Sequence, residues 1–120
     1  MMKYLCSLTC LSFLMLGCSN DHVEPAKSYA TLAEAQAAIN FENEKIDDLI
    51  AQIRYVQSDR DKKTLMCERI PQQYDKVTAL MDANQHLMTA SDQLREAEMR
   101  RMITDQKAKF LNSRYCSLKD

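Results

Sequence analysis

The sequence predicts an all-α protein, a small antiparallel bundle of three helices, or four with a break at Pro71, stapled by a disulfide. Three observations lead to this fold class. Gly17 is the only glycine in the chain, and tight hairpins and phosphate-binding loops use glycine to reach positive φ. Apolar residues recur at helical spacing between capping sequences. Two cysteines, Cys67 and Cys116, stand where helix ends of such a bundle would meet.

The first seventeen residues have the order of an export signal. Lys3 precedes a mostly apolar run over residues 4–16, and polar sequence resumes at Ser19. A membrane-spanning helix needs about 20 apolar residues, so this run is too short for a permanent span and suits a cleaved signal peptide. We therefore expect residues 1–17 to be removed. The alternative is an uncleaved apolar N-terminus.

The end of this run, Leu14-Met15-Leu16-Gly17-Cys18, resembles the lipobox of bacterial lipoproteins, in which a small residue precedes the lipidated cysteine. The resemblance covers only the export segment. It implies cleavage before Cys18 and a diacylglyceryl group on its thiol, so that two or three acyl chains hold the protein on a membrane. Ser19, where retention at the inner membrane favours Asp, implies the periplasmic face of the outer membrane.

A tether and one helical domain are expected after the signal. Residues 18–30 comprise the lipidated cysteine and a polar stretch with Pro25 and no apolar periodicity, which is typical of a flexible linker. Residues 31–120 are then a single helical periplasmic domain, because roughly 100 residues suffice for one small domain and not for two.

The first helix is predicted at about 32–57. Thr31 and Glu34 fit a capping box at its start. One heptad stripe, interrupted by Glu42, holds its apolar positions: Leu32, Ala35, Ile39, Ile46, Leu49, Ile53 and Val56. The polar run 58–63 predicts a turn.

Two further helices follow. The second has one apolar face, formed by Met66, Ile70, Tyr74, Val77, Met81 and Leu87 or Met88. Pro71 lacks an amide and disfavours helical geometry at Ile70, so we expect a kink there or a new helix beginning at Pro71. The third starts at the capping sequence Thr89 to Asp92 and runs to about Ser113.

Cys67 and Cys116 are the thiols that remain after export and lipidation. In an oxidising periplasm such a pair usually bonds, and the antiparallel bundle brings the start of the second helix close to the end of the third. Closing a loop of about 50 residues contributes on the order of 4 kcal/mol in the chain-entropy model. A redox site is the alternative, although catalytic dithiols favour Cys-x-x-Cys spacing.

The residues offer little for catalysis. His22 and His86 are the only histidines, and Asp82 with His86 makes two ligands where a zinc site needs more. Neither a Ser-His-Asp set nor a Gly-x-Ser-x-Gly motif can be assembled. We therefore expect no enzyme, metal site or cofactor. A net charge of −1 gives no sign of a nucleic-acid partner.

Charge and methionine patterns indicate a protein partner. The first helix is acidic and the last is basic, so the two either complement each other within the monomer or leave a basic surface for a partner. Candidate partner residues are Arg100, Arg101, Lys107 and Lys109, together with Met81 and Met88, which could line an adaptable groove or simply belong to the core.

These observations favour a lipid-tethered binding module that captures a peptide or subunit of an envelope assembly. In architecture alone, the predicted domain is similar to the helical pilotins of type II secretion, and no motif of theirs is matched here. The alternative is a self-associating spacer or exclusion lipoprotein, a homo-oligomer in which the heptads of the first helix zip to a second copy. Glu42 in the seam disfavours that alternative.

Overall fold

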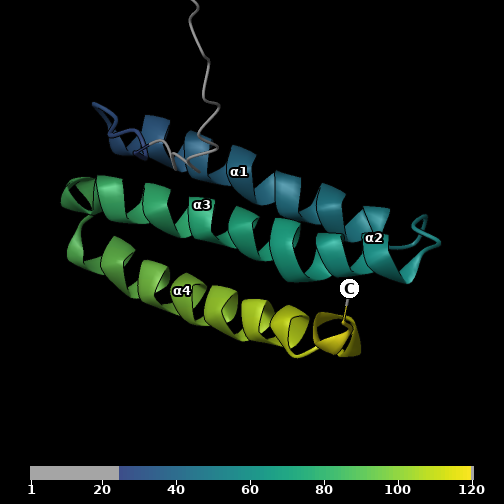
Figure 1. Ribbon diagram of the computed structural model, residues 1–120. Coiled ribbons are helices and arrows are strands. Elements are labelled where there is room, and N and C mark those ends of the chain that lie inside the picture. The colour runs from purple at the N-terminus through teal and green to yellow at the C-terminus, as the bar shows by residue number, and fades with distance from the viewer. Residues whose placement is uncertain (1–24, 120) are drawn as a thin grey trace, which may run out of the picture.

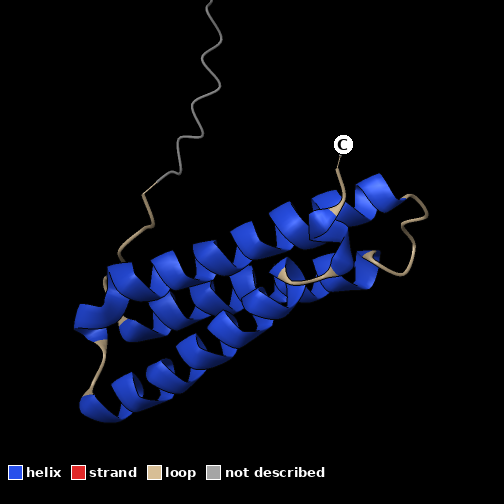
Figure 2. Cartoon of the chain, turned by 60° about the horizontal axis from the view of Figure 1, so that its bottom comes forward, coloured by secondary structure: helices blue, strands red, loops and turns tan. Residues whose placement is uncertain are grey.

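The computed structural model describes residues 25–119, which form helices joined by turns and contain no strand (Figures 1 and 2). The helices are α1 (Leu32–Gln52), α2 (Asp59–Lys63), the π-helical η1 (Thr64–Arg69), α3 (Ile70–Asn84), the 3-10 turn η2 (Gln85–Leu87), α4 (Ala90–Leu111) and the 3-10 turn η3 (Arg114–Ser117). The predicted all-α class is confirmed. The expected signal peptide and the lipobox with Cys18 lie outside the described residues.

Side chains cap the helix starts that the sequence predicts. The Thr31 hydroxyl accepts a hydrogen bond from the amide of Glu34 at 3.3 Å. At α4, Thr89 and Asp92 form a reciprocal capping box. No residue between 25 and 119 has positive φ, which agrees with connections that need no glycine.

The turn predicted at residues 58–63 is wrong by five positions. α1 ends at Gln52, and the connection occupies residues 53–58, including Val56. Ser58 accepts from the amide of Asp61 at 3.1 Å and starts α2. Ser and Asp favour helix N-termini as well as turns, because their oxygens accept from first-turn amides, so the polar run is compatible with either structure.

The expected loss of helical geometry at Ile70 does not occur, since Ile70 has φ −66° and ψ −49°; what precedes Pro71 is a π-helical segment. η1 ends at Arg69, and α3 begins at Ile70 with Pro71 in its first turn. α2, η1 and α3 follow each other without an intervening loop. A π turn replaces i→i−4 bonds locally, which relieves the clash and the missing donor that proline brings into a helix.

α3 lies beside both α1 and α4, whereas α1 and α4 make few contacts with each other (Figure 1). The contacts are paired in opposite sequence order: Gln73 with Glu42 and Arg69 with Gln52 on one side, Asp82 with Arg100 and Asp75 with Lys107 on the other. The core cluster draws on all three long helices: Ile39, Ile46, Leu49, Leu65, Ile70, Tyr74, Val77, Leu80, Met81 and Ile103.

The predicted disulfide is confirmed. Cys67 of η1 and Cys116 of η3 are bonded, with Cα atoms 5.6 Å apart. Next to it, the Lys63 ammonium donates to the carbonyl of Leu118 at 2.6 Å. Together these contacts hold the segment after α4 against the start of the α2–α3 helix.

Residues before α1 are also attached to the helices. Asn84, which is 0% exposed, accepts from the Tyr29 amide at 2.8 Å. Its own amide donates to the carbonyls of Lys27 at 3.0 Å and Leu80 at 2.8 Å. Ala26 and Tyr29 pack against the core. The chain therefore contacts the helices before α1 begins. Within residues 25–119, no helix combines the length and apolarity that crossing a membrane requires.

Candidate partner-binding surfaces

The two methionines predicted to meet a partner lie in different surroundings. Met81 is 1% exposed and belongs to the core of α3, so a partner cannot reach it in the folded chain. Met88 is half-buried in the connection before α4. The alternative that methionine at helical spacing is plain core therefore describes Met81.

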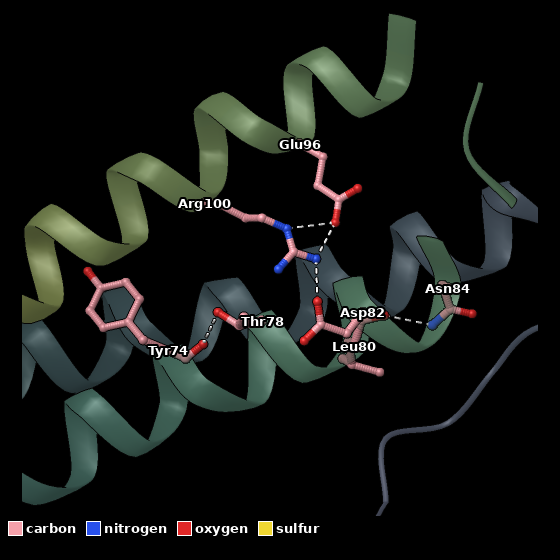
Figure 3. A network of polar contacts seen from close by, with 7 residues as sticks. All are labelled: Tyr74, Thr78, Leu80, Asp82, Asn84, Glu96 and Arg100. Carbon is pink, nitrogen blue, oxygen red and sulfur yellow. Dashed lines mark hydrogen bonds and ion pairs between the residues drawn. The ribbon is translucent and has the colours of Figure 1, made fainter. Parts of the chain in front are cut away.

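Arg100 is bound within the chain. Its guanidinium donates to Glu96 Oε1 at 2.9 Å through Nε, and Nη2 lies 2.6 Å from Asp82 Oδ1 (Figure 3). The Glu96 side chain is only 4% exposed, so its charge needs the neighbouring cation. Burial by itself lowers the pKa of Arg100, but the two carboxylates outweigh it and raise that pKa. Arg100 thus joins α4 to α3.

Lys107 also pairs with α3, through Asp75 Oδ1 at 2.5 Å. The basic charge of α4 is therefore complemented by acids of α3, and none of the ion pairs found in the described chain joins α4 to the acidic α1. Of the four predicted cations, Arg101 and Lys109 are the two that remain exposed.

An exposed stripe runs along α4. It consists of Arg95, Met99, Met102, Gln106 and Lys109, spaced at i, i+4, i+7, i+11 and i+14, and is called the α4 stripe below. Met99 is 39% and Met102 58% exposed. Methionine is apolar, so two of them on the outside of one helix face form a surface that a partner could cover.

The α4 stripe borders the core. Ile103, the neighbour of Met102, belongs to the same cluster as Ile46 of α1 and Tyr74 of α3. One turn beyond Ile46, Ile50 is 37% exposed. Apolar side chains of α1 and α4 thus remain accessible where the two helices flank α3.

A second surface is a polar groove between α1 and α3, with a volume of about 360 Å³. It is called the α1–α3 groove below, and it is lined by Lys45, Asp48, Leu49, Gln52, Arg69, Gln72, Gln73 and Lys76. Sequence reasoning missed it, because its residues come from two helices and share no motif. The single hint was Glu42, the charged residue in an apolar stripe.

Glu42 is held at the edge of this groove. Gln73 Nε2 donates to Glu42 Oε2 at 2.7 Å and to its carbonyl at 2.8 Å, while Lys45 Nζ donates to Oε1 at 2.9 Å. Burial alone raises the pKa of Glu42, but these hydrogen bonds and the positive charge of Lys45 and Lys76 outweigh it, so the pKa is lowered. The interruption of the heptad stripe is therefore a satisfied interhelical contact.

Groups for metal binding are not assembled in the part of the chain that the structure describes. No cluster of three His, Cys, Asp or Glu residues occurs there. Asp82, considered with His86 as a ligand pair, is bound to Arg100. Cys67 and Cys116 lie far apart in sequence and are bonded to each other.

Comparison with known proteins gives no relative: no protein-family model, curated protein or solved structure matches this chain. The function has to be inferred from the two surfaces themselves.

Proposed function

We propose that this chain is a non-catalytic outer-membrane lipoprotein, anchored through acyl chains on Cys18, whose periplasmic domain binds a protein partner in envelope assembly or secretion, as pilotins do. In this proposal the helices form a small antiparallel three-helix bundle that presents the α4 stripe. The observation that carries the proposal is the exposure of Met99 and Met102 on a helix whose other face is fastened to α3.

The stripe is suited to a helical partner. Methionine side chains adapt to different apolar surfaces, and spacing by three and four positions matches the ridge of an amphipathic helix. The backbone beneath is already fixed by Arg100, Lys107 and the disulfide that follows α4. A preformed surface loses little conformational entropy on binding, which favours affinity.

Charge defines the partner further. Arg95 and Lys109 mark the two ends of the stripe, about 21 Å apart along the helix axis. Glu98 and Asp105 lie in the next row of α4, away from the core, and set the opposite charge there. The matching partner is an amphipathic helix with an apolar ridge over the methionines and acidic residues at both ends of that ridge.

The lipid anchor supports this function by confining the domain to the membrane surface. Confinement raises the effective concentration of the stripe for partners in the same envelope layer without any new contact. Anchoring itself is tested by labelled palmitate: the wild-type chain incorporates it and moves to the membrane fraction, and Cys18→Ser does neither.

The partner is tested by placing a photo-crosslinking amino acid at Met102 of the full-length protein in cells. We expect an adduct with one envelope protein, identified by mass spectrometry, and none from the same probe at the exposed Asn40 of α1. Adding Met99→Asp should abolish the adduct, because it puts a charge in the apolar contact. Ala97→Asp, the same charge on the exposed flank of α4, should leave it intact.

An adduct that survives Met99→Asp contradicts a partner on the stripe. Adducts only between two copies of this chain would support the self-associating alternative. The heptads of α1 do not favour that alternative, because Ile39, Ile46 and Leu49 are buried in the chain's own core. A second copy would have to use α4.

A further inference from the structure

We propose that the α1–α3 groove is a second binding site, one that takes an acidic peptide segment in an extended conformation. This site is independent of the function proposed for α4. The groove is lined by residues of α1, η1 and α3, whereas the α4 stripe consists of residues of α4. The two surfaces therefore share no residue.

Positive charge exceeds negative charge in the groove. Lys45, Arg69 and Lys76 line it together with one carboxylate, Asp48, and Glu42 at its edge is paired with Lys45, so one positive charge remains in excess. This excess occurs in a chain whose net charge is −1. Arg69 Nη1 makes one long hydrogen bond, of 3.5 Å, to Gln52 Oε1, which leaves the other guanidinium donors for a ligand.

The Glu42 network positions donors in the groove wall. Glu42 accepts from both Lys45 and Gln73, so it fixes the direction of these two side chains. A charged residue between packed helices is usually no more stabilising than an apolar residue of similar size. In our proposal the Glu42 network occurs at this position because it holds Lys45 in place to donate to an anionic ligand. Lys45 keeps two of its three N–H donors for that ligand.

The shape and amides of the groove favour a peptide over a small anion. Lys45 and Gln52 lie two turns apart on α1, and Arg69 at the end of η1 lies the same number of residues before Lys76 of α3, which gives a length of about 10 Å. Carboxylates three residues apart on a chain in the extended polyproline II conformation lie on the same side, about 9 Å apart. The side-chain amides of Gln52 and Gln72 can both donate and accept, as a peptide backbone requires, while Gln73, whose two N–H groups both go to Glu42, can only accept.

The test uses the full-length lipoprotein in detergent micelles and a fluorescein-labelled peptide, acetyl-Ser-Glu-Ser-Ala-Glu-Ser-amide. Fluorescence anisotropy should show saturable binding, weakened about tenfold or more when both glutamates become glutamine. The double variant Arg69→Gln/Lys76→Gln should lose affinity by a similar factor. Its matched control, Arg60→Gln/Lys119→Gln, removes the same charge from exposed positions outside both proposed surfaces and should bind like wild type.

Equal loss in the control variant would show attraction to net charge alone and would overturn the proposal. Unchanged binding by Arg69→Gln/Lys76→Gln would overturn it as well, as would binding of phosphatidylglycerol vesicles, but not the peptide, through these residues. A readout that needs no variant is the ¹⁵N spectrum of the side-chain amides. Peptide should shift Gln72 and Gln73, and a spectrum without such shifts excludes the site.

Discussion

α3 and α4 are both long helices, but α3 is amphipathic and α4 is polar on most of its surface, and they differ in how much they bury. α3 buries eight of its 15 residues, and α4 buries two of its 22. The difference follows from position, because α3 has a helix on each of two sides and α4 packs on α3 alone (Figure 1). A helix in the middle of three is committed to the core, and a helix at the side keeps surface available for other molecules.

The two helices are also held by different forces. α3 is stabilised by apolar burial, which contributes about 25 cal/mol for each Å² removed from water. α4 contributes Ile103 to the core and forms two ion pairs with acidic residues of α3. An ion pair at the protein surface contributes less than about 1 kcal/mol. The covalent bond after α4 therefore has a large share in keeping it in place.

Removing the disulfide should have the largest effect. Cys67→Ser loses about 4 kcal/mol of unfolding free energy, which corresponds to a fall of roughly 15–30 °C in Tm. Hydrogen exchange should rise first in α4 and η3, while α1 and α3 keep most of their protection. Cys116→Ser should behave in the same way, and no change in Tm in either variant would contradict the staple.

Substituting one methionine in each helix compares the packing of α3 and α4 most directly. Met81→Ala in α3 leaves a cavity and should cost about 2–5 kcal/mol in urea unfolding. Met102→Ala in α4 removes the same atoms from a side chain that is 58% exposed and should cost less than about 0.5 kcal/mol. Comparable losses in the two variants would mean that α4 is as deeply packed as α3.

Asn84 tests how the end of α3 holds the residues before α1. Asn84→Ala removes three hydrogen bonds and leaves the Tyr29 amide without its acceptor, so we expect a loss of about 2–3 kcal/mol. Asn43→Ala, on the exposed side of α1, serves as the control and should change stability by less than about 0.5 kcal/mol. Proteolysis near residue 28 should also accelerate in Asn84→Ala alone.

The smallest effect concerns acid stability at the α1–α3 contact. The folded-state pKa of Glu42 is lowered, so its contribution is present at pH values above the unfolded pKa near 4.5 and is lost as the pH falls through the folded value. Glu42→Gln should therefore flatten the decline of unfolding free energy below about pH 4.5. Glu44→Gln, on the exposed side of α1, is the control; an equal flattening there would contradict the assignment.

Capping residues and apolar spacing predicted where the helices lie, but they predicted the helix ends less accurately. Thr31, Ser58 and Thr89 accept from first-turn amides as their sequence contexts suggest. The end of α1 was misplaced, because Ile53 and Val56 continue the apolar spacing into a connection where they pack against the core. Periodicity reports which residues are buried, and it does so whether or not the backbone beneath them is helical.

The binding surfaces could not be predicted from local sequence patterns, because they depend on which helices pack together. Arg100, Arg101, Lys107 and Lys109 look alike in the sequence, yet two of them pair with Asp82 and Asp75 and two remain exposed. The α1–α3 groove combines side chains from helices about 25 residues apart, so no sequence window contains it.

The sequence by itself determined that the domain after residue 31 would be helical, because caps and apolar spacing act between near neighbours, and it predicted the bond between Cys67 and Cys116. Only the tertiary structure decided that α3 lies between the others, that Met81 is core and that Met102 is surface. Both helices carry methionine, and whether a given methionine is buried depends on what packs against its helix, which is a property of the whole arrangement.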